Sequence, residues 1–273
     1  MWIQGFDWAV TDENRNAIAL DLLHHSNIID PNKRELFYPI ARRLFAASND
    51  TRSGKMPSVI GVPVEGDSPL LVNVMYQNLT DSVQKVFLRL FFSYEKKKNL
   101  IGPVDVYTVY LDAGGPLLPR DFDVPSGRMT KSYAANPIAN GKLWAIGGHL
   151  HDYGQMIKLV DSTSNHVIWE AEPEEGGDGY VKSSPMEVFY IPKKIKKGHR
   201  YAIVAVYDNP LDHPSPDKGM GTIGAIFRPS DESELWYKPD YDNELYIEDM
   251  RTMLEAPLKG HDHHKMKHGS SHN

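Results

Sequence analysis

The chain has 273 residues, a formal net charge of −6 at neutral pH and no cysteine. This length allows a large hydrophobic core in one or two domains, and the negative charge argues against a nucleic-acid partner. The absence of cysteine excludes disulfides, thiolate zinc sites and cysteine nucleophiles. No apolar run approaches the roughly 20 residues that a transmembrane helix needs.

The first residues of the chain, 1–5, do not form a secretory signal peptide. They contain neither a basic segment nor a long apolar core, and both are needed for export by that route. Two interpretations follow: the protein is cytoplasmic, or a leader has been removed from it.

Most of the first half consists of short apolar or alternating segments between turn residues, which is typical of β-strands. Residues 37–47 are predicted to form a short helix or an irregular segment, and residues 48–55 a polar loop. Residues 112–120 contain Gly-Gly-Pro and are predicted to be a linker. The predicted strands of this half are residues 2–10, 18–29, 59–64, 70–78, 86–94 and 104–111.

The second half continues the same pattern, with weak helical periodicity only at residues 244–254. Residues 172–179 are predicted to be an acidic, glycine-rich loop. Residues 122–129 contain the Pro-Ser-Gly turn of a β protein. The predicted strands of this half are residues 144–150, 156–160, 166–170, 186–191, 201–207 and 222–227.

Many short strands with frequent Gly and Pro turns predict an all-β fold of two jelly-roll-like β-sandwich domains in tandem. The predicted domains are residues 1–115 and 116–255. Residues 256–273 hold five of the twelve histidines and are predicted to be a disordered tail. This tail could capture metal, or it could be an affinity-type artefact.

The segment 144–154 is an apolar strand that ends in a His-x-His pair. Residues two apart on a strand point to the same face, so His149 and His151 can direct two imidazoles at one point. Imidazole suits copper, zinc, iron and nickel, and Gly147 and Gly148 leave room around an ion. The simpler interpretation is a pair of surface histidines at a strand end.

Four further residues are candidate ligands: His24, His25, Met75 and Met220. Neighbours on a regular strand point to opposite faces, so His24 and His25 can share a metal only if the strand has a kink or bulge. Met75 on a strand could simply fill the core, whereas Met220 lies between two glycines and is a less typical core residue.

A His-His pair, a later His-x-His pair and a methionine about 70 residues further on resemble the copper type II, ascorbate-dependent monooxygenase family. That family includes the peptidylglycine α-hydroxylating and dopamine β-monooxygenases. The resemblance covers about residues 1–253 and implies two β-sandwich domains that each hold one copper, up to two per chain. The two coppers would lie apart, across a cleft, and ascorbate or another reductant would supply electrons.

The resemblance also implies a role for each ligand. His24 and His25 would hold the electron-transfer copper, with Met75 standing where the family has a third histidine. His149, His151 and Met220 would hold the catalytic, oxygen-activating copper. Methionine ligates copper through a soft thioether, so the first site either persists as two histidines and a methionine or is lost.

The substrate-binding positions of the family are not kept. Gly147, Thr222 and Gly224 stand where the peptide-hydroxylating members have an arginine, an asparagine and a tyrosine that hold a peptide carboxylate. None of the three can make a charge-assisted contact, so we expect no activity on glycine-extended peptides. Copper in these folds usually works outside the cytoplasm, which favours a periplasmic or extracellular protein.

Three functions follow as alternatives. The first is a copper-dependent monooxygenase acting on an unknown small-molecule or peptide substrate. The second is a non-enzymic, extracytoplasmic copper carrier, buffer or sensor. The third is a β-sandwich binding module with incidental histidines, in which tryptophans would contact a glycan. Asp152 and Asp208 are the predicted acceptors for the second ring nitrogens of the ligands, and His213 is a spare ligand.

Overall fold

The computed structural model describes residues 1–18, 22–48, 51, 53–76, 78, 81–96, 102–117, 120–177, 180–183, 185–231 and 236–255. These residues form strands β1 to β20 and the helix α1 (Glu244–Glu255). The predicted all-β fold of sandwich type is confirmed. No described helix has the length and apolar character needed to cross a bilayer. The predicted tail, residues 256–273, lies outside the described residues.

The N-terminal sandwich is built from two sheets whose buried side chains alternate along the strands. In β1, for example, Trp8 and Val10 are buried, because every second residue faces the other sheet. The first sheet contains β4 (Ser53–Lys55), β1 (Trp2–Thr11), β5 (Ile60–Pro63), β8 (Val104–Asp105) and β7 (Phe87–Glu95). The second contains β3 (Ala41–Ser48), β2 (Leu23–Arg34) and β6 (Leu71–Tyr76).

The C-terminal sandwich has two four-stranded sheets. One is β17 (Met186–Ile195), β12 (Gly141–Leu150), β20 (Gly221–Pro229) and β9 (Tyr107–Asp112). The other is β11 (Gly127–Ala135), β18 (Tyr201–Asn209), β13 (Gly154–Asp161) and β14 (His166–Ala171). Two short two-stranded sheets accompany them: β10 (Phe122–Val124) with β19 (Ser215–Gly219), and β15 (Glu174–Gly177) with β16 (Tyr180–Ser183).

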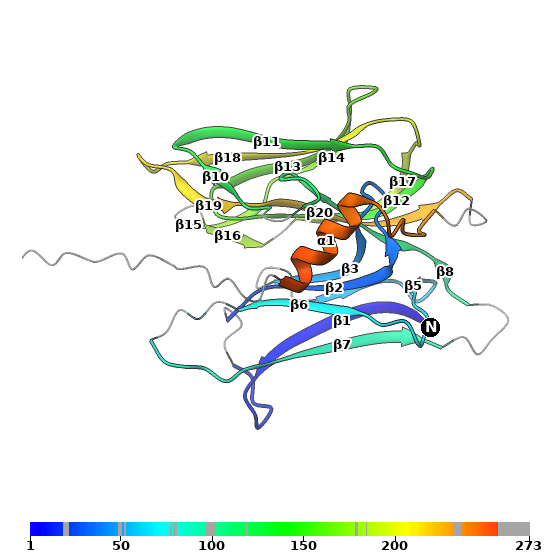
Figure 1. Ribbon diagram of the computed structural model, residues 1–273. Coiled ribbons are helices and arrows are strands. Elements are labelled where there is room, and N and C mark those ends of the chain that lie inside the picture. The colour runs from blue at the N-terminus through cyan, green and yellow to red at the C-terminus, as the bar shows by residue number, and fades with distance from the viewer. Residues whose placement is uncertain are drawn as a thin grey trace, which may run out of the picture.

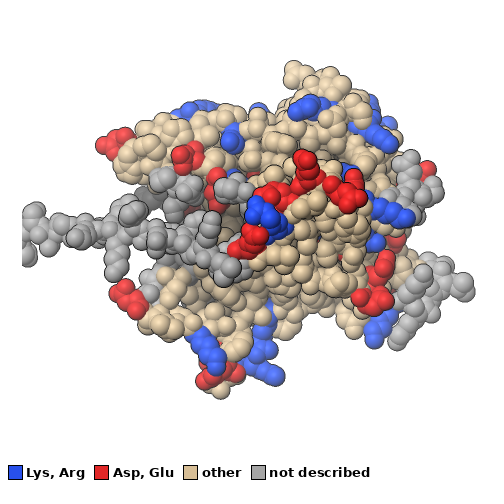
Figure 2. Space-filling view, viewed as in Figure 1, with Lys and Arg blue, Asp and Glu red and all other residues tan. Residues whose placement is uncertain are grey.

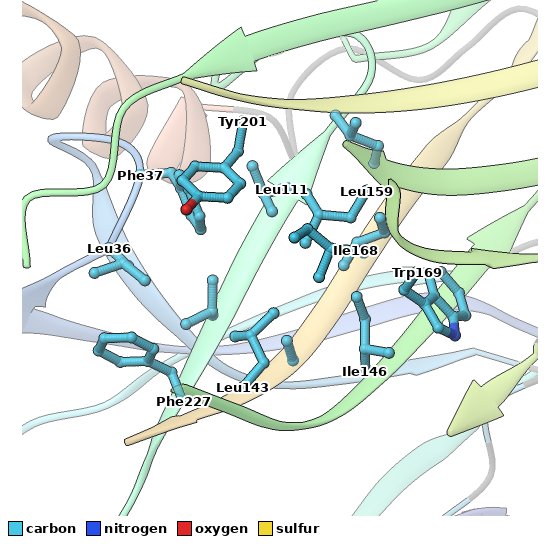
Figure 3. Close-up of a cluster of buried hydrophobic side chains, with 14 of the residues drawn as sticks. Leu36, Phe37, Leu111, Leu143, Ile146, Leu159, Ile168, Trp169, Tyr201 and Phe227 are labelled. Atoms are coloured by element: carbon cyan, nitrogen blue, oxygen red, sulfur yellow. The ribbon is translucent and has the colours of Figure 1, made fainter. Parts of the chain in front are cut away.

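Each sandwich contributes a segment to the other. Leu36 and Phe37, from the first half of the chain, lie in the core of the C-terminal sandwich (Figure 3). In the opposite direction, Tyr246 of α1 packs with Ile29 and Ala41 of the N-terminal sandwich. Figure 1 shows the two sandwiches one above the other, with α1 at their junction. The two sandwiches are therefore interlocked as well as adjacent.

Several sequence predictions need correction. Of the segment predicted as a short helix or irregular, residues 37–40 are irregular, but residues 41–48 form β3, because their backbone pairs with β2. The predicted boundary at residues 115/116 falls inside the C-terminal sandwich, since β9 pairs with β20 whereas β8 pairs with β5. The predicted linker begins with the end of β9 and a turn, and the predicted loop 172–179 includes β15.

A buried group of charged side chains joins the two sandwiches; we call Glu35, Arg43, Asp112, Arg120 and Asp249 the ionic cluster. Arg43 of β3 donates to both carboxylate oxygens of Asp249 on α1, at 2.8 and 2.5 Å. Arg120 adds a 3.4 Å contact to Asp249 and lies 3.9 Å from Asp112. Buried charges need such partners, so the cluster holds β3, α1 and β9 in one arrangement.

Glu35 completes the ionic cluster through backbone donors. Its carboxylate accepts hydrogen bonds from the backbone N–H groups of Arg43, at 2.6 Å, and Tyr110, at 3.2 Å. Burial raises the pKa of Glu35 to about 7, against the opposing effect of the neighbouring arginines. Burial likewise raises the pKa of Asp112 to about 6, against the effect of Arg120. Desolvation therefore destabilises the ionised form of both carboxyl groups, which lie where β3 meets β9.

Candidate metal centre

The first histidine pair lies at an irregularity of β2. Leu23 is opposite Tyr76 of β6, and His25 is opposite Met75, so His24 is an extra residue in the pairing. Such a bulge breaks the alternation of faces, and the His24 and His25 ring centroids lie only 4.1 Å apart. The bulge supplies the kink that joint ligation by neighbouring residues requires.

The second pair lies at the end of β12. His149 is opposite Thr222 of β20, and His151 follows the last residue of the strand. Leu150, between them, is buried in the core of the C-terminal sandwich. His149 and His151 therefore both point away from this core, and their ring centroids are 5.1 Å apart.

The structure brings the two pairs together between the sandwiches; we call His24, His25, His149 and His151 the histidine cluster. The Nε2 atoms of His25 and His151 are 3.2 Å apart, with the two rings nearly parallel. One ring nitrogen from each of His24, His25 and His151 lies within 4.8 Å of the other two. The His149 ring centroid is 5.4 Å from that of His25. All four side chains are half-buried.

The donor set fits a transition-metal ion. A zinc-type ion binds imidazole nitrogens at about 2.0–2.1 Å, so two such nitrogens at the tetrahedral angle lie about 3.3 Å apart. The observed 3.2 Å between His25 and His151 matches that separation. The same distance also suits an N–H···N hydrogen bond between two neutral imidazoles. Two protonated rings would repel each other here.

The predicted separation of two copper sites across a cleft does not match this arrangement. His25, expected at the electron-transfer site, faces His151, expected at the catalytic site, at 3.2 Å. Spacing along the chain could not reveal this, because it says nothing about how β2 of one sandwich faces β12 of the other.

The two predicted methionine ligands lie next to the histidine cluster. Met75 is directly opposite His25 on β6, so both side chains are on the same face of the sheet. Met75 is 42% exposed, at the rim of the junction. The Met220 carbonyl accepts a hydrogen bond from the His151 N–H at 3.3 Å, which places Met220 beside the second pair.

Tyr207 holds the end of β12, a role that the sequence did not reveal. Its hydroxyl accepts from the N–H groups of Met220, at 3.0 Å, and His151, at 3.4 Å. It also donates a short hydrogen bond to the Met220 carbonyl, so its one donor and two acceptor positions are all used. Burial raises the pKa of Tyr207 well above the usual tyrosine value, which keeps this donor protonated.

A bare stretch of sheet lies next to His149. Gly147 of β12 is opposite Gly224 of β20, and both lie two residues along their strands from His149 and Thr222, on the same face of the sheet. A Cβ atom added at Gly224 would meet nothing within 4 Å, and at Gly147 its nearest contact would be at 3.4 Å. We call this pair the glycine shelf. It leaves open space on the face of the sheet that carries His149.

The remaining predicted residues lie elsewhere. The Asp152 carboxylate accepts from the Val181 N–H at 3.4 Å, and the Asp208 N–H donates to the Tyr153 carbonyl. His213 is exposed and its Nδ1 lies 3.1 Å from the Pro214 carbonyl. Of the five tryptophans proposed for glycan binding, Trp8, Trp169 and Trp236 are buried in the cores. Core packing accounts for these three tryptophans.

Comparison with known proteins adds little to this geometry. No family model matches the sequence, and no curated protein matches it. Among solved structures the chain is similar to the STIV MCP, at 9% identity and a TM-score of 0.41, over 86% of this chain and 90% of that one. It is also similar to a protein of the infectious bursal disease virus Gx strain, at 9% identity and a TM-score of 0.24. That match covers 86% of this chain and 57% of the viral chain. TM-scores this low carry no functional conclusion.

Proposed function

We propose that this protein binds copper through the histidine cluster, with ligands from both sandwiches in one shared centre. The observation that carries the proposal is the 3.2 Å separation between the Nε2 atoms of His25 and His151. These residues are 126 positions apart in the chain, and they come from different sandwiches, His25 from β2 and His151 from the end of β12.

Copper is favoured over other metals by the residues at the rim of the cluster. Copper(II) has the highest affinity in the divalent series, and thioethers favour copper(I). Met75 lies opposite His25, and Met220 is hydrogen-bonded through its backbone to His151. A mixed imidazole and thioether set can therefore serve both oxidation states. Protonation of the imidazoles competes with the metal, so binding weakens at acid pH.

The proposed activity is hydroxylation of a small molecule by dioxygen with an external reductant such as ascorbate. One oxygen atom enters a C–H bond, and the other leaves as water after the reductant supplies two electrons and solvent supplies two protons. Bound copper would supply the redox chemistry and an open position for dioxygen. The chain's own contribution is to orient the imidazoles, through the β2 bulge and Tyr207, and to leave access to His149 over the glycine shelf.

The glycine shelf also suggests what kind of substrate fits. It has no side chain that could grip a carboxylate at Gly147 or Gly224, and Ala145 and Ile226 form the next cross-strand row. A compact, uncharged substrate suits this surface better than a peptide end. Enzymatic use of copper favours an extracytoplasmic location, where dioxygen and loosely held copper are available.

The first experiment measures copper binding and the Cu(II) EPR spectrum of protein in which the five tail histidines are alanine. We expect copper to bind, and His151→Ala to reduce its affinity by more than about a hundredfold, because even supporting residues cost 10–100-fold. His213→Ala removes an exposed histidine and serves as the matched control. Equal binding by the His151→Ala variant would contradict the proposal.

A second candidate function, copper carriage or buffering without turnover, is favoured by one observation. Met75 is 42% exposed next to His25, and an accessible thioether suits transfer of copper(I) to a partner. Gly224→Phe separates the two functions, because the new ring fills the space over the glycine shelf. If Gly224→Phe blocks ascorbate-dependent turnover but leaves copper binding unchanged, the enzymatic function is supported. If the unsubstituted protein shows no turnover, the carrier function is supported.

A further inference from the structure

The edge strand β17 displays a group of exposed apolar side chains. Met186, Val188, Tyr190 and Ile191 are 73%, 75%, 100% and 74% exposed. Val188 is opposite Ala145 and Lys193 is opposite Leu143, so the residues between them bulge out of the pairing with β12. Exposed apolar groups gathered on one strand commonly mark an interaction surface.

Basic side chains lie at the same end of the sheet. Lys194 of β17 is opposite Lys142 of β12, which is itself opposite Arg228 of β20. Like charges directly opposite each other on neighbouring strands destabilise a sheet. Lys196 and Lys197 follow on the next turn. Four lysines and one arginine therefore gather within this region of a chain whose net charge is −6.

Apolar and basic residues of β17 share one face of the sheet. Leu143 and Ile146 both lie in the core of the C-terminal sandwich, so Lys142 and Ala145 face outward. Val188, opposite Ala145, and Lys194, opposite Lys142, then lie on that same outer face. Figure 2 shows Lys and Arg side chains gathered at the right-hand end of the upper sandwich, where Figure 1 labels β12 and β17.

We propose that this region, the β17 surface, docks onto a membrane containing anionic phospholipids. The β17 surface consists of these apolar and basic side chains: Lys142, Met186, Val188, Tyr190, Ile191, Lys194, Lys196 and Lys197. Apolar side chains that enter the head-group region, bordered by lysines that meet the phosphates, are the two signals that stable peripheral binding needs. This proposal is independent of copper binding.

Other occupants fit the β17 surface less well. A second copy related by a two-fold axis would bring the Lys142 and Lys194 row near its own equivalent, with like charges facing each other. An added β-strand is disfavoured because the strand bulges and Pro192 lacks an N–H donor. Nucleic acid would leave Tyr190 and Ile191 without an apolar partner.

The test is sedimentation of the full-length protein with vesicles of phosphatidylcholine, alone or mixed with phosphatidylserine. We expect binding to the mixed vesicles only, weakening as salt rises. Each lysine near an anionic surface contributes roughly fivefold in affinity. The combined variant Lys142→Gln, Lys194→Gln and Lys197→Gln should therefore bind roughly a hundredfold more weakly. Tyr190→Ser with Ile191→Ser should lower binding by about tenfold or more.

The matched control is Lys55→Gln, Lys85→Gln and Lys96→Gln, which removes the same charge from exposed positions of the N-terminal sandwich. Unchanged binding by this control supports docking through the β17 surface. Equal weakening by the control, equal binding to both vesicle types, or no binding to either would overturn the proposal. A concentration-dependent dimer that Tyr190→Ser with Ile191→Ser abolishes, without vesicle binding, would assign the β17 surface to a second copy instead.

Discussion

Two polar clusters join the same pair of sandwiches, and they are built in opposite ways. The ionic cluster is fully buried, and its charges are matched by charge-assisted hydrogen bonds, such as those from Arg43 to Asp249. The histidine cluster is half-buried and holds imidazoles that face one another. The ionic cluster therefore connects the two sandwiches without any ligand. The histidine cluster has the composition of a site that a bound ligand would complete.

Removing one member of the ionic cluster should have the largest effect. Arg43→Ala leaves the Asp249 carboxylate buried with the 3.3 Å hydrogen bond from the Ala41 N–H and the 3.4 Å contact to Arg120, and removing one partner of a buried ion pair costs about 3–5 kcal/mol. Chemical denaturation measures the loss. Arg251→Ala, which breaks exposed pairs on α1, should cost less than about 1 kcal/mol. Equal losses of unfolding free energy in the two variants would show that the ionic cluster does not stabilise the contact between the sandwiches.

Removing one member of the histidine cluster should affect metal binding much more than stability. His25→Ala should reduce copper affinity by more than about a hundredfold, while the free energy of unfolding without metal changes by only about 1 kcal/mol. Isothermal titration and denaturation measure the two quantities on the same samples. His166→Ala, at an exposed position on β14, is the control. A large loss of stability in His25→Ala with intact metal binding would show that the histidine cluster stabilises the fold and does not bind metal.

The pH dependence of stability sharpens the comparison further. Glu35 has a native pKa of about 7, above its ordinary value of 4.5, so the native state binds the proton more tightly. Its contribution to the free energy of unfolding is therefore largest below pH 4.5 and falls as the pH rises towards 7, by on the order of 1–3 kcal/mol. Glu35→Gln should flatten this slope in denaturation curves measured across that range. A slope identical to that of the unchanged protein would contradict this assignment.

Tyr207 connects the core to the histidine cluster, and its effect should be smaller. Tyr207→Phe removes the hydroxyl that serves three backbone groups, at a cost of about 1–2 kcal/mol, and it should lower copper affinity by about tenfold. Tyr201→Phe is the matched control, because its hydroxyl accepts one bond, from the Lys196 N–H, away from the site. Comparable losses of copper affinity in both variants would argue against a positioning role for Tyr207.

The smallest effect is expected at Met75. Met75→Leu should weaken copper(I) binding by less than about tenfold and leave copper(II) binding unchanged, because the thioether prefers the reduced ion. Competition with a copper(I) chelator measures this. Met186→Leu, on the exposed edge of the other sandwich, is the control. No difference between the two variants would remove Met75 from the ligand set.

Sequence patterns predicted the all-β fold and singled out the histidines. Turn residues and short alternating runs report local structure, and the His-x-His spacing reports a shared face. The β2 bulge was not predicted, because Leu22 and Leu23 before the pair carry no turn signal. The ionic cluster was also not predicted, since Glu35, Arg120 and Asp249 are brought together by the packing of separate elements.

The exchange of segments between the sandwiches has a consequence for the order of synthesis. Ile29 and Ala41 pack against Tyr246 and Met253 of α1, and Arg43 pairs with Asp249. Arg43 and Asp249 are 206 positions apart in the chain. During translation, at about 5–20 residues per second, Arg43 therefore emerges well before its partner on α1 is made. The ionic cluster that joins the two sandwiches is therefore complete only after α1 has been made. A chain stalled before α1 should expose the part of β2 and β3 that α1 covers and lack the carboxylate that pairs with Arg43.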